Sequence, residues 1–299
     1  MIAGPTASGK SALGLALAER TGGVLVNADS AQVYGDLPIL SATPTAEDLN
    51  RADHRLYGVL DGAQPCSAAD WATLARAEIA AIHAEGRLPV LVGGTGLYLR
   101  TLLDGIAPVP PIDPEVRAKV RAGTLAGNRV QLAQLDPDAA KRIGVNDSSR
   151  TARALEVVLS TGRSLRSWQS EREGGIGEHI DLKPLILLPP RAWLYERCDR
   201  RFHDMVRDGA VEEVASLLGR GLSPELPVMR AIGVDELGGF IRGACRLEEA
   251  IAAGQQATRR YAKRQYTWFA HQPPSHWPRF TDALDGPSAG VALELLAQI

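Results

Sequence analysis

The sequence of 299 residues has few cysteines and no long apolar segment. Its three cysteines, Cys66, Cys198 and Cys245, are far apart and odd in number, so we expect reduced thiols rather than a disulfide framework or a zinc site. No apolar run approaches the roughly 18–20 residues that span a membrane. No basic-then-apolar export signal precedes the glycine-rich segment near the start of the sequence. These absences predict a cytoplasmic protein with no membrane partner, and we expect a monomer.

Lysine is also scarce, because only five of the 33 basic residues are Lys. The formal net charge is −2, so the overall charge does not indicate a nucleic-acid partner. The arginines nevertheless cluster, and Arg binds phosphate through two parallel N–H donors. Each cluster could equally be a solvated helix face. The clusters are Arg142, Arg150 and Arg153, then Arg197, Arg200 and Arg201, then Arg259, Arg260, Lys263 and Arg264.

The order of apolar segments predicts an α/β fold. Strands are expected at 1–3, 24–26, 57–60 and 89–92, and helices at 11–20 and 68–85. Strands that alternate with helices form a parallel sheet, and ligands of such a sheet bind at the carboxyl ends of its strands. Only three residues precede the first glycine, so either the start of the sequence is truncated or the first strand is unusually short.

The pattern changes after the proline-rich segment 107–114. Residues from about 115 to 168 have a helical pattern, and a glycine-rich loop and the apolar segment 185–190 follow. Roughly seventy residues between two sheet strands exceed one crossover helix. We therefore predict a P-loop core at 1–112 and 180–299, in which helices flank a parallel sheet, and an inserted all-helical domain at 113–179. Further helices are expected at 193–218 and from 247 to about 269.

The sequence G-P-T-A-S-G-K-S at residues 4–11 has the pattern of a phosphate-binding loop. Its glycines let backbone N–H groups turn toward phosphate oxygens, and the helix that follows adds its positive end. The lysine supplies a positive charge and the last serine a hydroxyl for Mg²⁺. The predicted diphosphate-binding residues are Gly4, Thr6, Ala7, Ser8, Gly9, Lys10 and Ser11, and Ser11 is also the predicted ligand of Mg²⁺.

The carboxylate that a nucleotide hydrolase uses to hold Mg²⁺ is missing from its usual place. Such a carboxylate ends a hydrophobic strand, but the strand at 89–92 runs into the G-G-T-G segment 93–96. Asp29 instead follows the strand at 24–26, where a carboxylate faces the acceptor and can take its proton. Asp29 could equally be a turn residue or a helix N-cap. Thr95 offers a hydroxyl, and the glycines around it would allow a ligand to approach closely.

The segment TRRYAKRQYTWFA at 258–270 places basic residues at helical spacing before Trp268 and Phe269. The pattern is typical of a helix that lies against RNA phosphates. It is equally typical of a helix with a solvated basic face and an aromatic core anchor.

Five segments resemble the bacterial tRNA dimethylallyltransferases, also called tRNA isopentenyltransferases. They are IAGPTASGKS, NADSAQVY, PVLVGGTGLYLR, NDSSRTARALEVVLSTG and TRRYAKRQYTWF, and their order and spacing also match over nearly the whole chain. The resemblance implies that a dimethylallyl group passes from dimethylallyl diphosphate to N6 of adenine 37 in tRNA and that diphosphate is released. No phosphoryl group would then move, which accounts for the missing carboxylate.

The resemblance also implies roles for single residues. Asp29 would be the base, Thr95 would lie near the target nucleotide, and Arg201 would help the loop to hold diphosphate. Adenine 37 would be flipped out of the anticodon loop into a channel between the core and the inserted domain. The residues expected to contact the anticodon stem-loop are Ser30, Ala31, Gln32, Arg117, Ser149, Arg150, Arg153, Arg259 and Lys263.

Three other functions remain open from the residues alone. The first is a small-molecule P-loop kinase that binds ATP, against which the arginine-rich insert and the basic helix argue. The second is an adenylate isopentenyltransferase that acts on free nucleotide and needs no tRNA surface. The third is a non-catalytic RNA-binding protein that uses the loop as a nucleotide switch, against which Asp29 and Thr95 at neighbouring strand ends argue.

Overall fold

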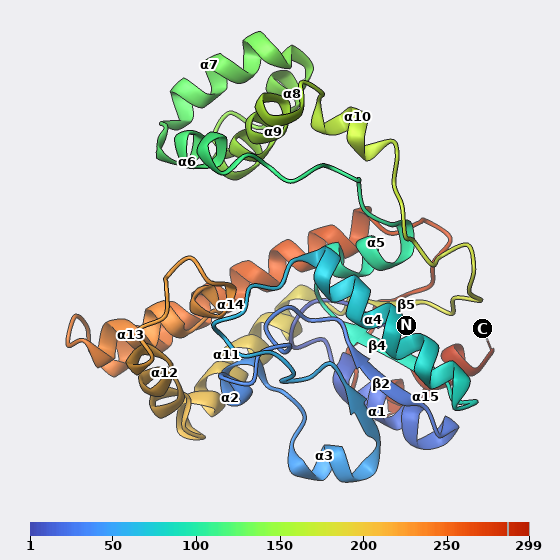
Figure 1. The fold of residues 1–299 in the computed structure, drawn as a ribbon. Coiled ribbons are helices and arrows are strands. Elements are labelled where there is room, and N and C mark those ends of the chain that lie inside the picture. The colour runs from blue at the N-terminus through green and yellow to red at the C-terminus, as the bar shows by residue number, and fades with distance from the viewer. Residues whose placement is uncertain (286, 299) are drawn as a thin grey trace. The chain divides into compact units, whose positions relative to one another are not determined.

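The computed structural model describes residues 1–285 and 287–298 and divides the chain into two units (Figure 1). The larger unit comprises Met1–Leu102 and His179–Ile299, and the second comprises Leu103–Glu178. The second unit therefore begins before residue 113, at which the sequence placed the start of the insert. Within the residues described, no helix has both the length and the apolar character needed to cross a membrane.

A six-stranded parallel sheet lies at the centre of the larger unit, in the order β3-β2-β4-β1-β5-β6. Since β2, β4 and β1 are neighbours, the loops at their carboxyl ends meet at one edge of the sheet. These loops are the phosphate-binding loop, the segment that contains Asp29 and the segment that contains Thr95. The strands are β1 (Ile2–Ala3), β2 (Val24–Asn27), β3 (Asp53–Arg55), β4 (Pro89–Gly93), β5 (Leu185–Leu187) and β6 (Arg279–Phe280).

Helices surround this sheet, as the predicted fold class required. The first, α1, packs with the last, α15, and both contribute to a core that includes Leu13, Leu17 and Ala292. Helices α11 and α14 of the same unit lie side by side (Figure 1). The helices are α1 (Lys10–Thr21), α2 (Pro38–Ser41), α3 (Ala46–Arg51), α4 (Ala68–Ala84), α5 (Gly96–Asp104), α11 (Arg191–Arg207), α12 (Ala210–Gly219), the 3-10 helix η1 (Pro227–Arg230), α13 (Val234–Ile241), α14 (Leu247–His271) and α15 (Pro287–Gln298).

Two expected elements are wrong in detail. Residues 57–60 are not a strand of the sheet, because Leu56 and Gly58 both have positive φ and turn the chain there. Only Leu60 forms an isolated bridge, with Tyr34. The helix expected at 193–218 is two helices, because Gly209, with φ 108°, separates α11 from α12. A positive φ of this size is accessible to glycine but interrupts a helix.

The second unit is all-helical and has a core of its own. Leu132 and Leu155 are completely buried there and pack with Val120, Ala139 and Val158. A Thr, Ser or Asp side chain at each helix start accepts a backbone N–H of the first turn, which explains where the helices begin. The helices are α6 (Pro114–Ala122), α7 (Leu125–Leu135), α8 (Pro137–Arg142), α9 (Ser148–Thr161) and α10 (Leu165–Gln169).

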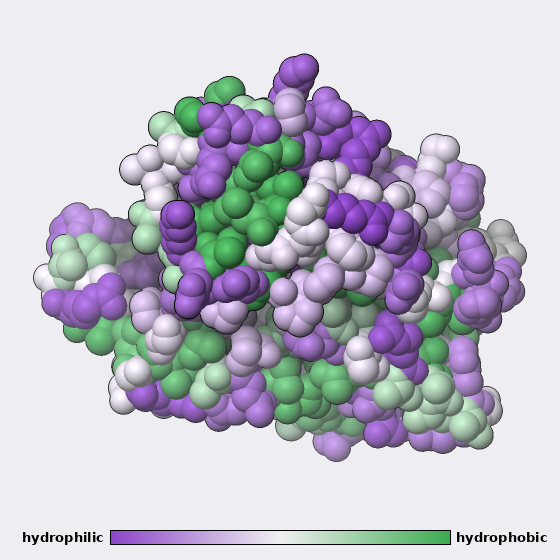
Figure 2. All heavy atoms as spheres, turned by 45° about the horizontal axis from the view of Figure 1, so that its top comes forward, coloured by the Kyte–Doolittle hydropathy of each residue, from purple (hydrophilic) through white to green (hydrophobic). Residues whose placement is uncertain are grey.

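On the face of the molecule drawn in Figure 2, hydrophilic side chains surround a patch of hydrophobic ones in the upper half of the view. Among the exposed apolar residues of the second unit, Val130 and Val145 are 63% and 69% accessible. Single apolar residues at a surface are common in folded proteins and do not by themselves indicate a function.

Candidate functional site

The phosphate-binding loop connects β1 to α1 and has the backbone conformation that its glycines allow. Gly9, with φ 93°, immediately precedes Lys10, the first residue of α1. Ala7 also has a positive φ of 61°, which is uncommon for a residue with a Cβ. The buried hydroxyl of Ser8 makes no hydrogen bond to any residue the structure describes. The loop therefore has the strained, inward-turned conformation of an anion-binding nest.

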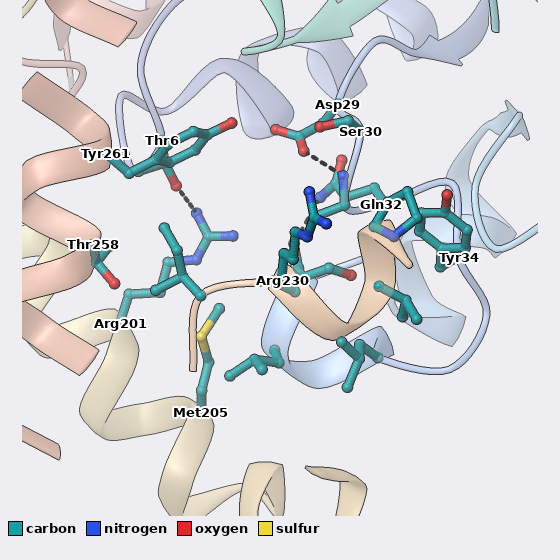
Figure 3. Close-up of a pocket in the computed structure, with 18 of the residues that line it drawn as sticks. Thr6, Asp29, Ser30, Gln32, Tyr34, Arg201, Met205, Arg230, Thr258 and Tyr261 are labelled. Carbon is teal, nitrogen blue, oxygen red and sulfur yellow. Dashed lines mark hydrogen bonds between the residues drawn. The ribbon is translucent and has the colours of Figure 1, made fainter. Parts of the chain in front are cut away.

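A buried cation, Lys10, and a half-buried one, Arg201, lie beside this loop. Lys10 donates from Nζ to the carbonyl oxygen of Pro5 at 3.2 Å, and burial lowers the pKa of its ammonium to about 8, although the charge of Asp29 acts in the opposite direction. Arg201 of α11 donates to the hydroxyl of Thr6 at 3.2 Å (Figure 3). Burial also lowers the pKa of the Arg201 guanidinium. A diphosphate between these two cations would favour their charged forms.

Arg197 of α11 supports the loop from outside the site. Its Nε donates to the carbonyl oxygen of Ala7 at 2.9 Å, and its guanidinium lies 4.6 Å from the ring centre of Trp193. This contact holds the residue at which the loop has its unusual backbone conformation. Neither Arg197 nor Trp193 was among the residues predicted for the site.

Asp29 is both a turn residue and a residue of the site. One carboxylate oxygen accepts the N–H of Ala31 at 3.1 Å, and the N–H of Asp29 donates to Asn27 Oδ1 at 2.7 Å. The same carboxylate lines a cavity of about 300 Å³ at the sheet edge. Its charge affects Lys10 and Arg201 across that cavity. The two interpretations of Asp29 that the sequence left open are therefore compatible.

Thr95 lies next to Asp29, as expected from the positions of β2 and β4. Its hydroxyl oxygen accepts the N–H of Ser30 at 2.9 Å and lies 3.3 Å from the hydroxyl of Ser30. The phenol of Tyr261 lies beside the hydroxyl of Thr95, and burial, together with the charge of Asp29, raises the pKa of that phenol. Thr95 thus positions the segment that begins at Asp29, whereas Ser30 and Tyr261 line the cavity itself.

The cavity has a charged end and an apolar end. The predicted residues that line it are Thr6, Lys10, Ser11, Asp29, Ser30, Ala31, Gln32 and Arg201. Figure 3 shows Arg201 and Thr6 on one side of this space and Asp29, Ser30 and Gln32 on another. The apolar wall comes from α2, α11 and the region around η1, and includes Leu37, Leu40, Phe202, Met205, Val228 and Ile232.

The sequence interpretation missed this apolar wall and the inner face of α14. The wall residues lie in short elements with no distinctive motif, so no pattern could have found them. The inner face of α14 did have a signal, because Thr258, Tyr261 and Gln265 follow one another at helical spacing. Thr258 and Tyr261 line the cavity, but only the basic residues of this segment and its aromatic pair, Trp268 and Phe269, were considered.

A second hollow, of about 720 Å³, lies on the outer side of the phosphate-binding loop. Lys10, Ser11, Arg201 and Met205 line both hollows. Ala7, Gly9, Arg197, Arg200 and the segment from Pro38 to Asp48 complete the second one. The loop is therefore open to a ligand from two sides.

The glycines of the G-G-T-G segment do not make room for a ligand, and that expectation is wrong. A Cβ on Gly94 would lie 2.4 Å from Nε2 of Gln265, and a Cβ on Gly96 would lie 2.5 Å from the Trp268 ring. Both glycines thus accommodate α14 of the protein itself. Trp268 and the buried Phe269 act as aromatic anchors of this helix, as one of the two interpretations of the segment held.

The residues predicted to contact tRNA lie on both units and differ in their surroundings. Lys263 on α14 is exposed, whereas Arg259 forms an ion pair with Asp199. In the second unit Arg117, Ser149 and Arg150 are exposed. Arg153 lies 4.0 Å from the buried carboxylate of Glu156, which Arg121 also contacts at 2.6 Å. Arg153 is thus held by its own unit, and the exposed residues are accessible to a ligand.

Comparison with known proteins identifies relatives of the whole chain. The model of the family described as IPP transferase matches residues 32–272. A tRNA dimethylallyltransferase of Sphingopyxis alaskensis is 59% identical over 285 residues, which cover 95% of this chain and 93% of that protein. The structure of a tRNA isopentenylpyrophosphate transferase of Bacillus halodurans has a TM-score of 0.69 at 32% identity, covering 99% of this chain and 96% of that one. A eukaryotic dimethylallyltransferase described as acting on tRNA has a TM-score of 0.75 at 28% identity, covering 89% of this chain and 68% of its own.

The fold and the site together define a P-loop protein in which the loop after β1 and the carboxylate of Asp29 after β2 line one cavity at the same edge of the sheet. Strand order, loop conformation and the separate helical unit all agree with this class. The chain belongs to the IPP transferase family. The family expected from the sequence motifs is thereby confirmed.

Proposed function

We propose that this protein transfers a dimethylallyl group from dimethylallyl diphosphate to N6 of adenine 37 in tRNA. One observation carries the proposal: Lys10 at the end of the phosphate-binding loop, Arg201 of α11 and the carboxylate of Asp29 line one cavity, and part of its wall is apolar. The cations suit a diphosphate, the apolar wall suits a five-carbon prenyl chain, and the carboxylate suits an amine that loses a proton. Relatives named tRNA dimethylallyltransferase support the same reaction.

The diphosphate of the donor would bind between the loop, Lys10 and Arg201. Backbone N–H groups of the loop and the start of α1 supply further positive potential. As the bond between carbon 1 and the bridging oxygen breaks, its electron pair stays with the diphosphate. The two cations stabilise this developing negative charge. We therefore propose that the leaving group lies on the side of the loop.

The acceptor amine would approach from the side of Asp29. The exocyclic amine of adenine is a weak nucleophile, because its lone pair is delocalised into the ring. The carboxylate of Asp29 can accept a hydrogen bond from this amine and take up its proton as the bond from nitrogen to carbon 1 forms. Adenine 37 must leave the stack of the anticodon loop to reach this position, and base flipping provides such access.

Mg²⁺ fits the residues around the loop. Mg²⁺ in phosphate sites keeps several waters and binds substrate oxygens together with few protein groups. Ser11 is exposed at the start of α1 and lines both hollows, and its hydroxyl would hold the ion beside the diphosphate. Over residues 1–285 and 287–298 no group of three His, Cys, Asp or Glu side chains could hold a metal ion. When bound, Mg²⁺ would neutralise part of the diphosphate charge.

The tRNA would contact both units. We propose contacts at the exposed Lys263 of α14, at Ser30, Ala31 and Gln32 beside Asp29, and at the arginines of the second unit, Arg117 and Arg150 foremost. Salt-dependent binding is the expected signature of such phosphate contacts. We further propose that the enzyme acts in the cytoplasm and as a monomer.

The proposal is tested with two donors and two acceptors. The purified protein is incubated with dimethylallyl diphosphate and either unmodified tRNA or free AMP, and separately with ATP and tRNA. Mass analysis of the digested tRNA should find one dimethylallyl group on adenine 37 only when the prenyl donor is present. Prenylation of AMP but not of tRNA would instead identify an adenylate isopentenyltransferase. Phosphate transfer from ATP, with no prenylation, would identify a kinase.

A further inference from the structure

Gln265 of α14 is a buried amide that connects the two loops of the site. Its side chain is 6% accessible. Its Oε1 accepts the backbone N–H of Thr6 in the phosphate-binding loop at 2.8 Å. Its Nε2 donates to the carbonyl oxygen of Gly94, in the loop after β4, at 2.8 Å. One side chain thus bridges the donor loop and the acceptor loop, which are far apart in the sequence.

An uncharged amide is the group that this bridge requires. A backbone N–H can only donate and a carbonyl oxygen can only accept, so the two partners fix the orientation of the Gln265 amide. A carboxylate would satisfy Thr6 but would place negative charge against the carbonyl oxygen of Gly94. An apolar side chain would leave both backbone groups buried without a partner, which is costly. The chemistry of the bridge therefore depends on glutamine itself.

The surroundings of Gln265 leave it little freedom. A Cβ on Gly94 would lie 2.4 Å from Nε2 of Gln265 and 3.0 Å from the carbonyl oxygen of Gly4. The glycine at this position therefore lets the amide reach the loop. One turn earlier on α14, Tyr261 contacts the hydroxyl of Thr95. The helix thus holds the acceptor loop at two neighbouring points.

Each end of the bridge leads directly to a reacting group. Thr6 also receives a hydrogen bond from Arg201, which is placed to hold the leaving diphosphate (Figure 3). Gly94 precedes Thr95, whose hydroxyl oxygen accepts the N–H of Ser30 beside Asp29. The distance between leaving group and base is set by how far apart these two loops lie. Transfer rates are sensitive to such distances, since a misplacement of about 1 Å can cost about 100-fold.

We propose that Gln265 is a positioning residue for prenyl transfer, which ties the diphosphate loop to the acceptor loop and so sets the spacing between the donor carbon and the attacking amine. The proposal rests on the proposed function, because it assigns one loop to the donor and the other to the acceptor. Each loop keeps its own ligand contacts without the bridge. Loss of Gln265 should therefore lower the rate of transfer much more than it lowers the affinity for either substrate.

The test compares Gln265→Leu and Gln265→Glu with the wild-type protein and with Gln255→Leu as a matched control. Gln255 lies on the same helix and donates one hydrogen bond to the carbonyl oxygen of Asp199 at 3.0 Å, outside the cavity. Single-turnover prenylation, donor affinity, tRNA affinity and melting temperature are measured on each. We expect a loss of about 100-fold in rate for Gln265→Leu, with both affinities little changed, and a wild-type rate for the control.

The pH profile of Gln265→Glu distinguishes positioning from a general loss of stability. A protonated carboxyl keeps one O–H donor and one oxygen acceptor, as the amide does. Burial raises the pKa of a carboxyl, so the rate of Gln265→Glu relative to wild type should rise as the pH falls from about 8 to about 6. The same ratio for Gln265→Leu should stay flat. Lys10 and Tyr261 are present in every protein compared, so their contributions to the pH dependence cancel in these ratios.

Hydrogen exchange at the amide of Thr6 gives a readout that does not depend on catalysis. This amide should be protected in the wild-type protein and in the control, and should exchange faster in Gln265→Leu. If the wild-type protein prenylates no tRNA, the proposed function fails. If, in addition, the amide of Thr6 exchanges equally fast in Gln265→Leu and in the wild-type protein, the bridge is refuted as well. With an active wild type, a Gln265→Leu variant within a few-fold of the wild-type rate overturns the inference. The inference is also overturned if the loss of rate in Gln265→Leu is no larger than the loss that its lower melting temperature explains, with Gln255→Leu as the reference.

Discussion

The cations of the larger unit and those of the second unit differ in their surroundings. Lys10 is 8% accessible, and burial lowers its pKa. The side chain of Arg150 in the second unit is 80% accessible and lies 3.5 Å from the carboxylate of Asp147. A buried cation without a carboxylate bound to it is costly and indicates a small anionic ligand. An exposed arginine provides a surface that a polyanion can approach, which suits a large ligand such as tRNA.

Among the substitutions considered, a change of the proposed base, Asp29, should have the largest effect on the rate of prenylation. Asp29→Asn keeps the size of the side chain and its hydrogen bond to Ala31, but it removes the basic charge. The single-turnover rate of prenylation should fall by about 10²–10⁴-fold, as is typical for a general base. Donor affinity should persist, because in the proposed mechanism Lys10 and Arg201 hold the diphosphate. A loss of donor affinity as large as the loss of rate would move Asp29 to the leaving-group side.

The next largest effect should come from a cavity made in the core of the second unit. Leu132→Ala removes a completely buried side chain, and such changes cost about 2–5 kcal/mol of unfolding free energy. Because this core is separate from that of the sheet, donor affinity should be retained, while tRNA affinity falls. Denaturation followed by circular dichroism, together with both binding assays, checks this. Parallel losses of donor and tRNA affinity would show that the two units do not act separately.

Removing one buried cation should weaken donor binding moderately. Lys10→Ala should lower donor affinity by about 10–100-fold, since hydrogen bonds to charged groups contribute about 1.5–3 kcal/mol. The pKa of Lys10 is about 8 in the protein without ligand. Its ammonium is therefore lost as the pH rises through that value, and donor affinity should fall with it. Calorimetric titration at several pH values tests this, and a Lys10→Ala variant that keeps the wild-type pH dependence would contradict it.

Reversing exposed charges should have the smallest effect, and only on tRNA. Arg117→Glu and Arg150→Glu should each weaken tRNA binding a few-fold and reduce the slope of log affinity against log salt by about 0.7–0.9 for each phosphate that the protein no longer neutralises. Arg207→Glu, at an exposed arginine of α11, is the control and should change neither. If all three substitutions weakened tRNA binding equally, tRNA affinity would depend only on the net charge of the protein and not on contacts at Arg117 and Arg150.

The sequence predicted the parts of the site that depend on local chemistry. The loop at 4–11, Asp29 and Thr95 were found because their residue types carry a function in any fold, and parallel strand order explains why they meet. The apolar wall was not found, since a lone leucine has no local signal, and the helical spacing that groups Gln265 with Thr258 and Tyr261 does not say which groups this face of α14 contacts. Their roles arise from tertiary contacts such as the fit of Gln265 against Gly94. The strand expected at 57–60 failed because a leucine with positive φ cannot be recognised from an apolar pattern.

Competition for the phosphate-binding loop tests the central claim most directly. The claim is that this loop, with Lys10 and Arg201, holds the diphosphate of a prenyl donor in preference to the triphosphate of ATP. Binding of dimethylallyl diphosphate is measured by calorimetry in the presence of Mg²⁺, with diphosphate or ATP added as competitor. We predict that diphosphate displaces the donor, that ATP displaces it only weakly, and that Lys10→Ala weakens the binding of donor and diphosphate together. Tight binding of ATP with no measurable binding of the prenyl donor would contradict the account.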